Sequence, residues 1–282
     1  MHPAEQPPIA ATHCASPLSR RSRVSGRVLS VLILVLATGI GTAAFVYPFF
    51  AAPRQSGHGM NAHAQDAPLT FLLVVGLCLV VVIVSLETRQ MNSKVIAVLG
   101  VLVAINSVLR LVPGPLGFSA IFFLPILCGY VYGSDFGFLL GTLSLLVSAL
   151  VTNGMGPWLP YQMFATGWMG MAAAWLPDLS KRPRMEHLVL AVYGATLGLI
   201  FGAIMDLWFW PYLFDPGQLE RQWQPGYELW TTVAHFAVFY VATSLWWDLG
   251  RAVGNLLLIA LFGPPILRLL RRFKKRFHFE LE

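Results

Sequence analysis

Charged residues are scarce in this sequence: only 11% of its 282 residues are Asp, Glu, Lys or Arg, whereas 56% are hydrophobic. A soluble globule of this length needs a larger polar share to cover its core, so the composition excludes an ordinary soluble domain. Cysteine is also rare. Cys14, Cys78 and Cys128 fall in a predicted tail and two hydrophobic runs, which implies no disulfide framework.

Motifs for common chemistry are missing as well. There is no G-x-x-x-x-G-K-[ST] phosphate loop, no H-E-x-x-H, no G-x-S-x-G and no Cys/His cluster with metal-ligand spacing. We therefore expect no enzyme activity, no cofactor and no metal site, and any ATP hydrolysis would need another subunit. His58, Met60 and His63 are of types that bind soft metals, but we interpret them as parts of a solvated loop.

Long apolar runs are what the sequence does contain. A bilayer core about 30 Å thick takes about 20 apolar residues per helix. Eight candidate spans meet or approach this length: 28–50, 69–86, 94–111, 118–133, 136–152, 161–179, 187–210 and 230–262. The sequence therefore predicts an all-α, polytopic bundle of about eight spans in the lipid bilayer.

The basic residues lie beside the ends of these spans rather than along one polar face, which argues against nucleic acid as a partner. Most of the 19 Lys and Arg residues fall in segments that would share one side of the membrane: Arg20, Arg21, Arg23, Arg27, Arg89, Lys94, Lys181, Arg182, Arg184, Arg268, Arg271, Arg272, Lys274, Lys275 and Arg276. By the positive-inside rule we expect a multi-pass protein of the plasma membrane with both termini in the cytoplasm.

Composition divides the chain into four parts. Residues 1–27, rich in Pro, Ala, Ser and Arg, predict a disordered cytoplasmic tail. A two-span extension with an outer loop follows over 28–91, and a core of six spans over 92–265. The basic tail, 266–282, is either an amphipathic helix on anionic lipid or a simple stop-transfer cap.

Small residues recur four positions apart, a spacing that lets helices in lipid approach closely. Three stripes have this or nearly this spacing, the first with one step of three: Ser93, Ala97, Gly100 and Ala104; Gly129, Gly133, Gly137 and Gly141; and Gly194, Gly198 and Gly202. Internal packing accounts for all three. Docking of a partner membrane subunit is the alternative, and for it we favour the first stripe.

Polar residues within or near the outer ends of the spans are candidate ligand contacts. Asp248, Arg251 and Asn255 lie at i, i+3 and i+7 of the last span. Because a charge in lipid is costly, the acid and the guanidinium should pair or face a polar cavity, so a structural ion pair and a substrate contact both remain open. The further polar candidates are Asn106, Arg110, Gln162, Asp206 and His235.

Two aromatic outer segments add to these candidates. The segment 152–162 joins two spans with Gly and Pro, and it forms either a pocket wall or an interfacial aromatic belt. Its candidate contacts are Asn153, Trp158 and Tyr161. The segment 206–212 contains Trp210 and leads into a loop that could close over a flat or amphipathic ligand.

Several blocks from Lys94 to about Arg272 together resemble the substrate-specific subunits of energy-coupling factor (ECF) importers. The blocks are Ala97-Val98-Leu99-Gly100 to Ala104, Gly117-Phe118 to Phe122-Phe123-Leu124-Pro125, Gly133-Ser134-Asp135-Phe136-Gly137-Phe138, Gly154 to Met163, and Trp247 to Asn255. The resemblance implies a six-helix membrane protein that binds a vitamin. The two spans before Lys94 depart from that pattern.

The resemblance also implies the partners. The small-residue helix would dock on a transmembrane coupling subunit, and two cytoplasmic ATPases would drive the cycle that releases the vitamin inward. Among relatives, the chain is similar to the group proposed to carry cobalamin or related corrinoids. The alternative function is a ligand-sensing, regulatory or assembly membrane protein without transport activity.

Overall fold

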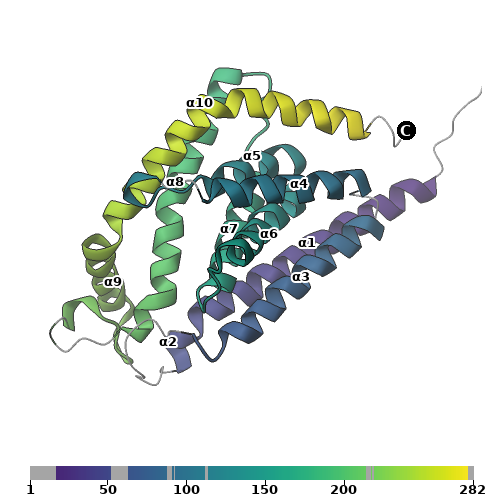
Figure 1. Ribbon diagram of the computed structural model, residues 1–282. Helices are drawn as coiled ribbons and strands as arrows, with labels where there is room; N and C mark the ends of the chain where they lie inside the picture. Colours follow the sequence, from purple (N-terminus) through teal and green to yellow (C-terminus); the bar gives the residue numbers. More distant parts are fainter. Residues whose placement is uncertain are drawn as a thin grey trace, which may run out of the picture.

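The computed structural model describes residues 17–51, 63–87, 91, 93–111, 114–213, 217 and 219–278. Over these residues the regular elements are all helices (Figure 1). Six of the helices are long and apolar enough to cross a membrane by length and composition. The prediction of an all-α membrane bundle is therefore confirmed.

The chain begins with α1 (Pro17–Val46), the short α2 (Pro48–Ala51) and α3 (Ala67–Glu87). α1 and α3 lie side by side along one flank of the molecule (Figure 1), and we call these two helices, with α2 and residues 63–66, the N-terminal hairpin. Val74, Cys78 and Val81 are buried where α3 faces the rest of the bundle. Of the tail predicted to be disordered, residues 1–16 lie outside the described part, whereas 17–27 form the first turns of α1.

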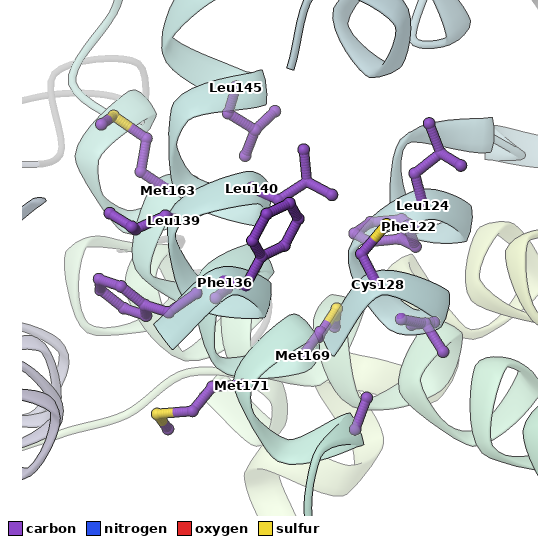
Figure 2. Close-up of a cluster of buried hydrophobic side chains, with 14 of the residues drawn as sticks. Phe122, Leu124, Cys128, Phe136, Leu139, Leu140, Leu145, Met163, Met169 and Met171 are labelled. Carbon is purple, nitrogen blue, oxygen red and sulfur yellow. The ribbon is translucent and has the colours of Figure 1, made fainter. Parts of the chain in front are cut away.

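The middle of the chain forms the best-packed part of the bundle. Its elements are α4 (Ser93–Leu109), two single 3₁₀ turns, η2 (Pro115–Gly117) and η3 (Ala120–Phe122), then α5 (Phe123–Tyr132), α6 (Ser134–Thr152) and α7 (Leu159–Ala173). Figure 2 shows buried side chains from η3 and these last three helices, among them Phe122, Cys128, Phe136 and Met169. Close helix contact is possible because Gly129 and Gly137 both lie against the carbonyl of Gly170, where a Cβ would overlap it.

The last part contains α8 (Pro183–Phe209), η4 (Trp210–Tyr212), η5 (Leu219–Arg221), α9 (Leu229–Thr243) and α10 (Leu245–His278). α10 runs antiparallel to α8, because Asp248 lies against Gly202 while Arg271 binds Glu186. Figure 1 shows α10 bending further on and crossing the end of the bundle. Two consecutive prolines, Pro264 and Pro265, lie inside this helix and account for the bend.

The predicted eighth span, 230–262, is wrong in one respect, because the chain is divided into α9 and α10 at Ser244. The Thr243 hydroxyl donates to the Phe239 carbonyl one turn back (2.7 Å), and hydroxyl bonds of this kind bend helices. The backbone bonds from Ser244 N to Tyr240 O (2.9 Å) and from Asp248 N to Ser244 O (3.0 Å) are kept. The chain therefore kinks at Ser244, and α9 and α10 follow each other end to end.

Candidate ligand site and its surroundings

Asp248 and Arg251 of α10 form an ion pair inside the bundle. Arg251 donates to the Asp248 carboxylate, and the exposed fractions of the two side chains are 15% and 2%. The guanidinium also donates to the Gly198 carbonyl (3.4 Å) and lies over the Phe201 ring, 5.1 Å from its centre. A lone charge at this depth would be costly, so the pairing explains how both residues are tolerated in a span.

The glycine stripe of α8 makes room for these polar side chains. A Cβ at Gly202 would overlap the Asp248 carboxylate, and one at Gly198 would come within 2.9 Å of the Ala252 backbone. One turn further, Asn255 donates to the Gly194 carbonyl (3.2 Å). This stripe therefore serves internal packing, the first of the two explanations that its spacing allows.

A second polar contact joins α8 to the kink between α9 and α10. The Ser244 hydroxyl donates to Asp206 Oδ1 (2.7 Å). The end of η5 lies nearby, since Trp210 donates to the Arg221 carbonyl (2.8 Å) and packs edge-on against Phe236. His235 donates to the Gln222 carbonyl (3.1 Å), so the rings of Trp210 and His235 both hold residues 221–222 in place.

The other predicted ligand residues form a separate group on α4, α6 and α7. Arg110, just beyond α4, donates to Ser148 Oγ (3.3 Å) and to Gln162 Oε1 (3.5 Å). One turn earlier, Asn106 is fully buried and donates to the Ile121 carbonyl (2.9 Å).

Asn153 and Trp158 flank the loop between α6 and α7. Asn153 ends α6 in the left-handed conformation (φ 52°), a common helix-terminating role for asparagine, and its side chain is exposed. Trp158 is the residue before the first turn of α7, and its ring packs against the hydrophobic core. The loop therefore enters α7 along a defined path.

The short η3 turn lies between the two polar groups. Its Ile121 carbonyl accepts the bond from Asn106, while the neighbouring Phe122 ring lies 4.8 Å from the Phe201 ring that Arg251 covers. The segment before it packs on α10, since Gly250 lies against Leu116 O and Gly254 against the Phe118 ring. The structure thus brings the two groups to opposite sides of one non-helical segment.

Several buried side-chain oxygens have no hydrogen-bond partner within the described residues. Asn106 Oδ1 and Ser119 Oγ lie beside η3, whereas Asp206 Oδ2 lies toward the Ser244 kink and Asn255 Oδ1 beside Gly194. Burying a polar atom without a partner costs about 1–3 kcal/mol, so such atoms usually mark strain, a water site or a ligand site. These four belong to α4, α8, α10 and the segment between them.

Sequence reasoning missed the most extensive polar cluster, at the end of the N-terminal hairpin where α3 begins. The interpretation of His63 as part of a solvated loop is wrong: only 2% of it is exposed, and its ring contacts Asp66, Tyr161 and Trp208. His58 and Met60 lie outside the described residues. The available signal was an imidazole and a carboxylate three residues apart, just before an apolar run.

Tyr161, predicted as a ligand contact, is committed to this cluster. Its hydroxyl donates to Asp66 Oδ2 (2.5 Å) and lies 2.8 Å from His63 Nδ1. Burial raises the pKa of the Asp66 carboxyl, but the hydrogen bonds from His63 and Tyr161 outweigh it and hold that pKa below its usual value of 3.8. Asp66 is therefore an anion at neutral pH.

The stripe of α4 differs from the other two in being open. Ser93, Ala97, Gly100 and Ala104 are all exposed, and a Cβ at Gly100 would meet nothing within 4 Å. Val101 and Val108 beside it are also exposed, at 60% and 62%. This is an apolar helix face with small residues along it that no described residue covers.

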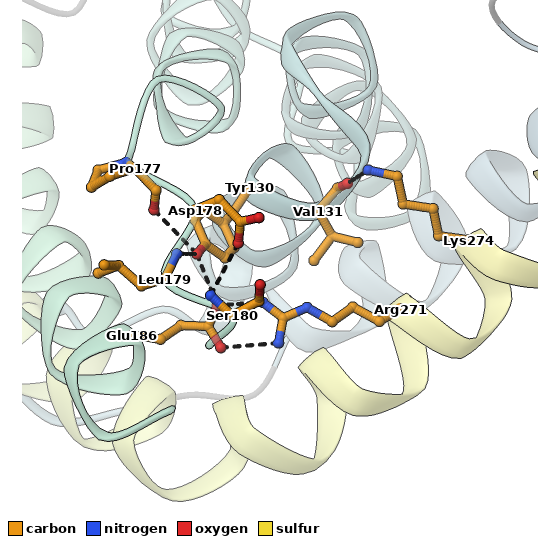
Figure 3. A network of polar contacts seen from close by, with 9 residues as sticks. All are labelled: Tyr130, Val131, Pro177, Asp178, Leu179, Ser180, Glu186, Arg271 and Lys274. Atoms are coloured by element: carbon orange, nitrogen blue, oxygen red, sulfur yellow. Dashed lines mark hydrogen bonds and ion pairs between the residues drawn. The ribbon is translucent and has the colours of Figure 1, made fainter. Parts of the chain in front are cut away.

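At the other end of the bundle, the basic end of α10 is tied to the body (Figure 3). Arg271 binds both carboxylate oxygens of Glu186, one of them at 3.0 Å, and Tyr130 donates to the same carboxylate (2.8 Å). Lys274 donates to the Val131 carbonyl. This part of the predicted basic tail is thus a helix anchored to the bundle, and neither of the two sequence interpretations included that anchoring.

Taken together, the long apolar helices, the internally paired charges and the glycine-lined contacts define a polytopic helical protein of the membrane. A family model described as "ECF transporter, substrate-specific component" matches residues 94–262, which is more than half of the chain, and the chain belongs to this family. The resemblance drawn from the sequence is thereby confirmed. No curated protein and no solved structure matches.

Membership defines the general role. The chain is the substrate-binding membrane subunit of an ECF importer, and it works with the coupling and ATPase modules of that importer on a small-molecule substrate. The matched segment begins at Lys94, so the N-terminal hairpin lies outside it.

Proposed function

We propose that this subunit captures a vitamin or related micronutrient, with a corrinoid favoured, from the outer side of the plasma membrane. Both termini are cytoplasmic in this proposal. The distribution of Lys and Arg supports that orientation, as does the position of the start of α1 and the end of α10 toward the same side of the molecule (Figure 1).

The observation that carries the proposal is a set of unpartnered oxygens on α4, α8 and α10. Asn106, Asp206 and Asn255 each present a buried oxygen without a donor among the described residues, and a ligand with several hydroxyl or amide groups would supply those donors. Arg110 and Gln162 add a guanidinium and an amide on the same side as Asn106. Such a site suits a ligand of the corrinoid kind, which has polar groups around its rim and can form several hydrogen bonds.

The exposed face of α4, formed by Ser93, Ala97, Gly100 and Ala104, is the surface that we propose for the coupling subunit. Small residues let a partner helix approach the backbone closely. The two other stripes are already filled by α7 and α10, which supports this choice.

The test is a ligand screen on detergent-purified protein by thermal unfolding, because a solute that binds only the folded state raises apparent stability. The panel contains cobalamin, cobinamide, riboflavin, thiamine and biotin. We expect a saturable rise in unfolding temperature with one corrinoid, reduced at least tenfold in apparent affinity by Asp206→Asn, a change of about 1.4 kcal/mol.

The matched control is Asp178→Asn, the same substitution in an exposed loop at the opposite end of α8. It should bind as the wild type does. A saturable shift with a different vitamin would replace the corrinoid as cargo, and no shift with any member of the panel would favour the sensing or assembly alternative.

A further inference from the structure

The N-terminal hairpin inserts one side chain into the core, and the surroundings of that side chain are unusual. The His63 ring stacks on Trp208 (centres 5.5 Å apart, 19° between planes) and lies 4.7 Å from the Tyr212 ring and 4.5 Å from the Tyr161 ring. The Tyr47 ring closes a fourth side at 5.8 Å. Aromatic faces around a ring with a carboxylate at its edge are the environment that proteins offer to cations.

The hydrogen-bond partners of the His63 ring require a proton on both of its nitrogens. His63 Nε2 lies 3.0 Å from the Trp208 carbonyl, which can only accept. His63 Nδ1 lies 2.7 Å from Asp66 Oδ2, and an ionised carboxylate also only accepts. The Tyr161 hydroxyl gives its own proton to Asp66, so it too can only accept from Nδ1.

A neutral imidazole would leave one of these contacts as two facing lone pairs. Asp66 Oδ2 lies within hydrogen-bond distance of both His63 Nδ1 and the Tyr161 hydroxyl. Within the described residues the titratable groups that face the ring are Asp66 from the hairpin, Tyr47 after α1, Tyr161 of α7 and Tyr212 of η4. No cation stands among these groups to oppose a charged ring.

We propose that His63 is an imidazolium that clamps the N-terminal hairpin onto the outer ends of α7 and α8, and that it thereby positions the segment 153–162. The hairpin and the core then move as one body. His63 and Asp66 are positioning residues, acting through Tyr161.

The link to ligand binding rests on the proposed function. Tyr161 lies in the first turn of α7, next to Gln162, which contacts Arg110. The loop that begins at Asn153 leads directly into this turn. Without this contact the hydroxyl of Tyr161 and the start of α7 would be free to move. That movement should disturb the neighbouring Gln162 and Arg110, which belong to the proposed ligand site.

The charge on the ring is tested by nitrogen NMR of the ligand-free protein in detergent. A single-histidine variant, in which the six other histidines are replaced by Gln, leaves His63 as the only imidazole; the replaced residues are His2, His13, His58, His187, His235 and His278. We expect two protonated ring nitrogens in this protein at neutral pH, and only one in the same protein carrying Asp66→Asn. One unprotonated nitrogen at neutral pH would overturn the proposal.

If that variant does not fold, the difference between spectra of the wild type and His63→Gln assigns the same signals. The positioning role is tested by hydrogen exchange of residues 153–162. We expect exchange about tenfold faster or more in His63→Gln and Asp66→Asn, the change expected from losing a charged hydrogen bond. His187→Gln, at the opposite end of α8, is the control and should exchange as the wild type does.

Unchanged exchange in 153–162 would overturn the positioning role even where the hairpin itself exchanges faster. Both measurements use protein without ligand. A failure of cobalamin and cobinamide to bind the wild type would therefore count against the proposed function alone, whereas binding by the wild type and weaker binding by Asp66→Asn would support both.

Discussion

At the scale of single residues, two ion pairs lie inside the bundle. Asp248 is paired with Arg251 within one helix, and Glu186 with Arg271 between two helices. In both pairs the carboxylate side chain is 2% exposed and the guanidinium is more accessible. Losing the cation therefore leaves a buried anion, which is the costly half of the pair.

Arg251→Met should lower the free energy of unfolding by about 3 kcal/mol, because Asp248 would stay buried without its partner. The double variant Asp248→Asn with Arg251→Met removes both charges and should recover most of that loss. Unfolding of the detergent-purified proteins measures both values. Equal losses in the single and double variants would contradict a structural ion pair.

Asp66 predicts a specific dependence on pH. Its pKa in the folded protein is below the unfolded value of 3.8, so its ionised form stabilises the fold above that pH, and the stabilisation is lost as pH falls through the folded pKa. The difference in unfolding temperature between the wild type and Asp66→Asn should be constant near neutral pH, begin to shrink near pH 3.8 and vanish only below the folded pKa of Asp66. A difference that persists at lower pH would show that charge is not the cause.

At the scale of helices, the position of a glycine decides its role. Gly137 lies where α6 meets α7, and a Cβ there would overlap the Gly170 carbonyl. Gly39 and Gly100 lie on open faces of α1 and α4, where a Cβ would meet nothing within 4 Å. The same residue type thus serves close packing in one helix and leaves an accessible surface in another.

Gly137→Ala should destabilise the protein by about 1–3 kcal/mol, since the backbones of α6 and α7 must move apart. Gly39→Ala is the matched control and should be neutral or slightly stabilising, because alanine favours the helix and meets no neighbour. Thermal unfolding of the two variants compares them directly. Equal stability would mean that α6 and α7 do not approach as closely as described.

Gly100→Leu tests the proposed docking surface without disturbing the fold. The leucine side chain projects from the exposed face of α4, so unfolding temperature should be unchanged, whereas co-purification with co-expressed coupling and ATPase subunits should fall severalfold. Gly39→Leu places the same side chain on an exposed face of α1 and should co-purify normally. Loss of the complex in both variants, or in neither, would exclude this face.

At the scale of the whole molecule, two locks at opposite ends hold the bundle together. The clamp around His63 joins the N-terminal hairpin to α7 and α8 at the outer end. Arg271 and Lys274 join the end of α10 to α8 and α5 at the other. Each lock connects two segments that are separated by a long stretch of the sequence.

Arg271→Gln should open the second lock. Glu186 would lose its charged partner, and we expect a loss of about 3 kcal/mol in stability together with faster proteolysis near the end of α10. Arg272→Gln changes the next residue, which is exposed, and should alter stability by less than about 0.5 kcal/mol. Similar effects in both variants would mean that the lock contributes no more than general surface charge.

Local properties of the sequence were sufficient for the helical class and for the family. Burial in lipid requires long apolar runs, and each run is a contiguous piece of chain, so the spans corresponding to α1, α3, α4 and α8 could be located to within a few residues, except that α1 also extends back over the predicted tail. The kink at Ser244 was not anticipated, because a hydroxyl that bonds back to its own helix leaves the hydropathy of the run unchanged.

The sequence by itself determined which residues belong in the membrane, since transfer into lipid depends on each segment's own composition. Only the tertiary structure decided which glycine stripes are covered by another helix. It also decided that Asp248 and Arg251 pack on the glycines of α8 and that the His63 side chain is buried in the core. Those outcomes depend on contacts such as His63 with Trp208 and Glu186 with Arg271, which join distant segments. Spacing along the chain carries no information about them until the helices have packed.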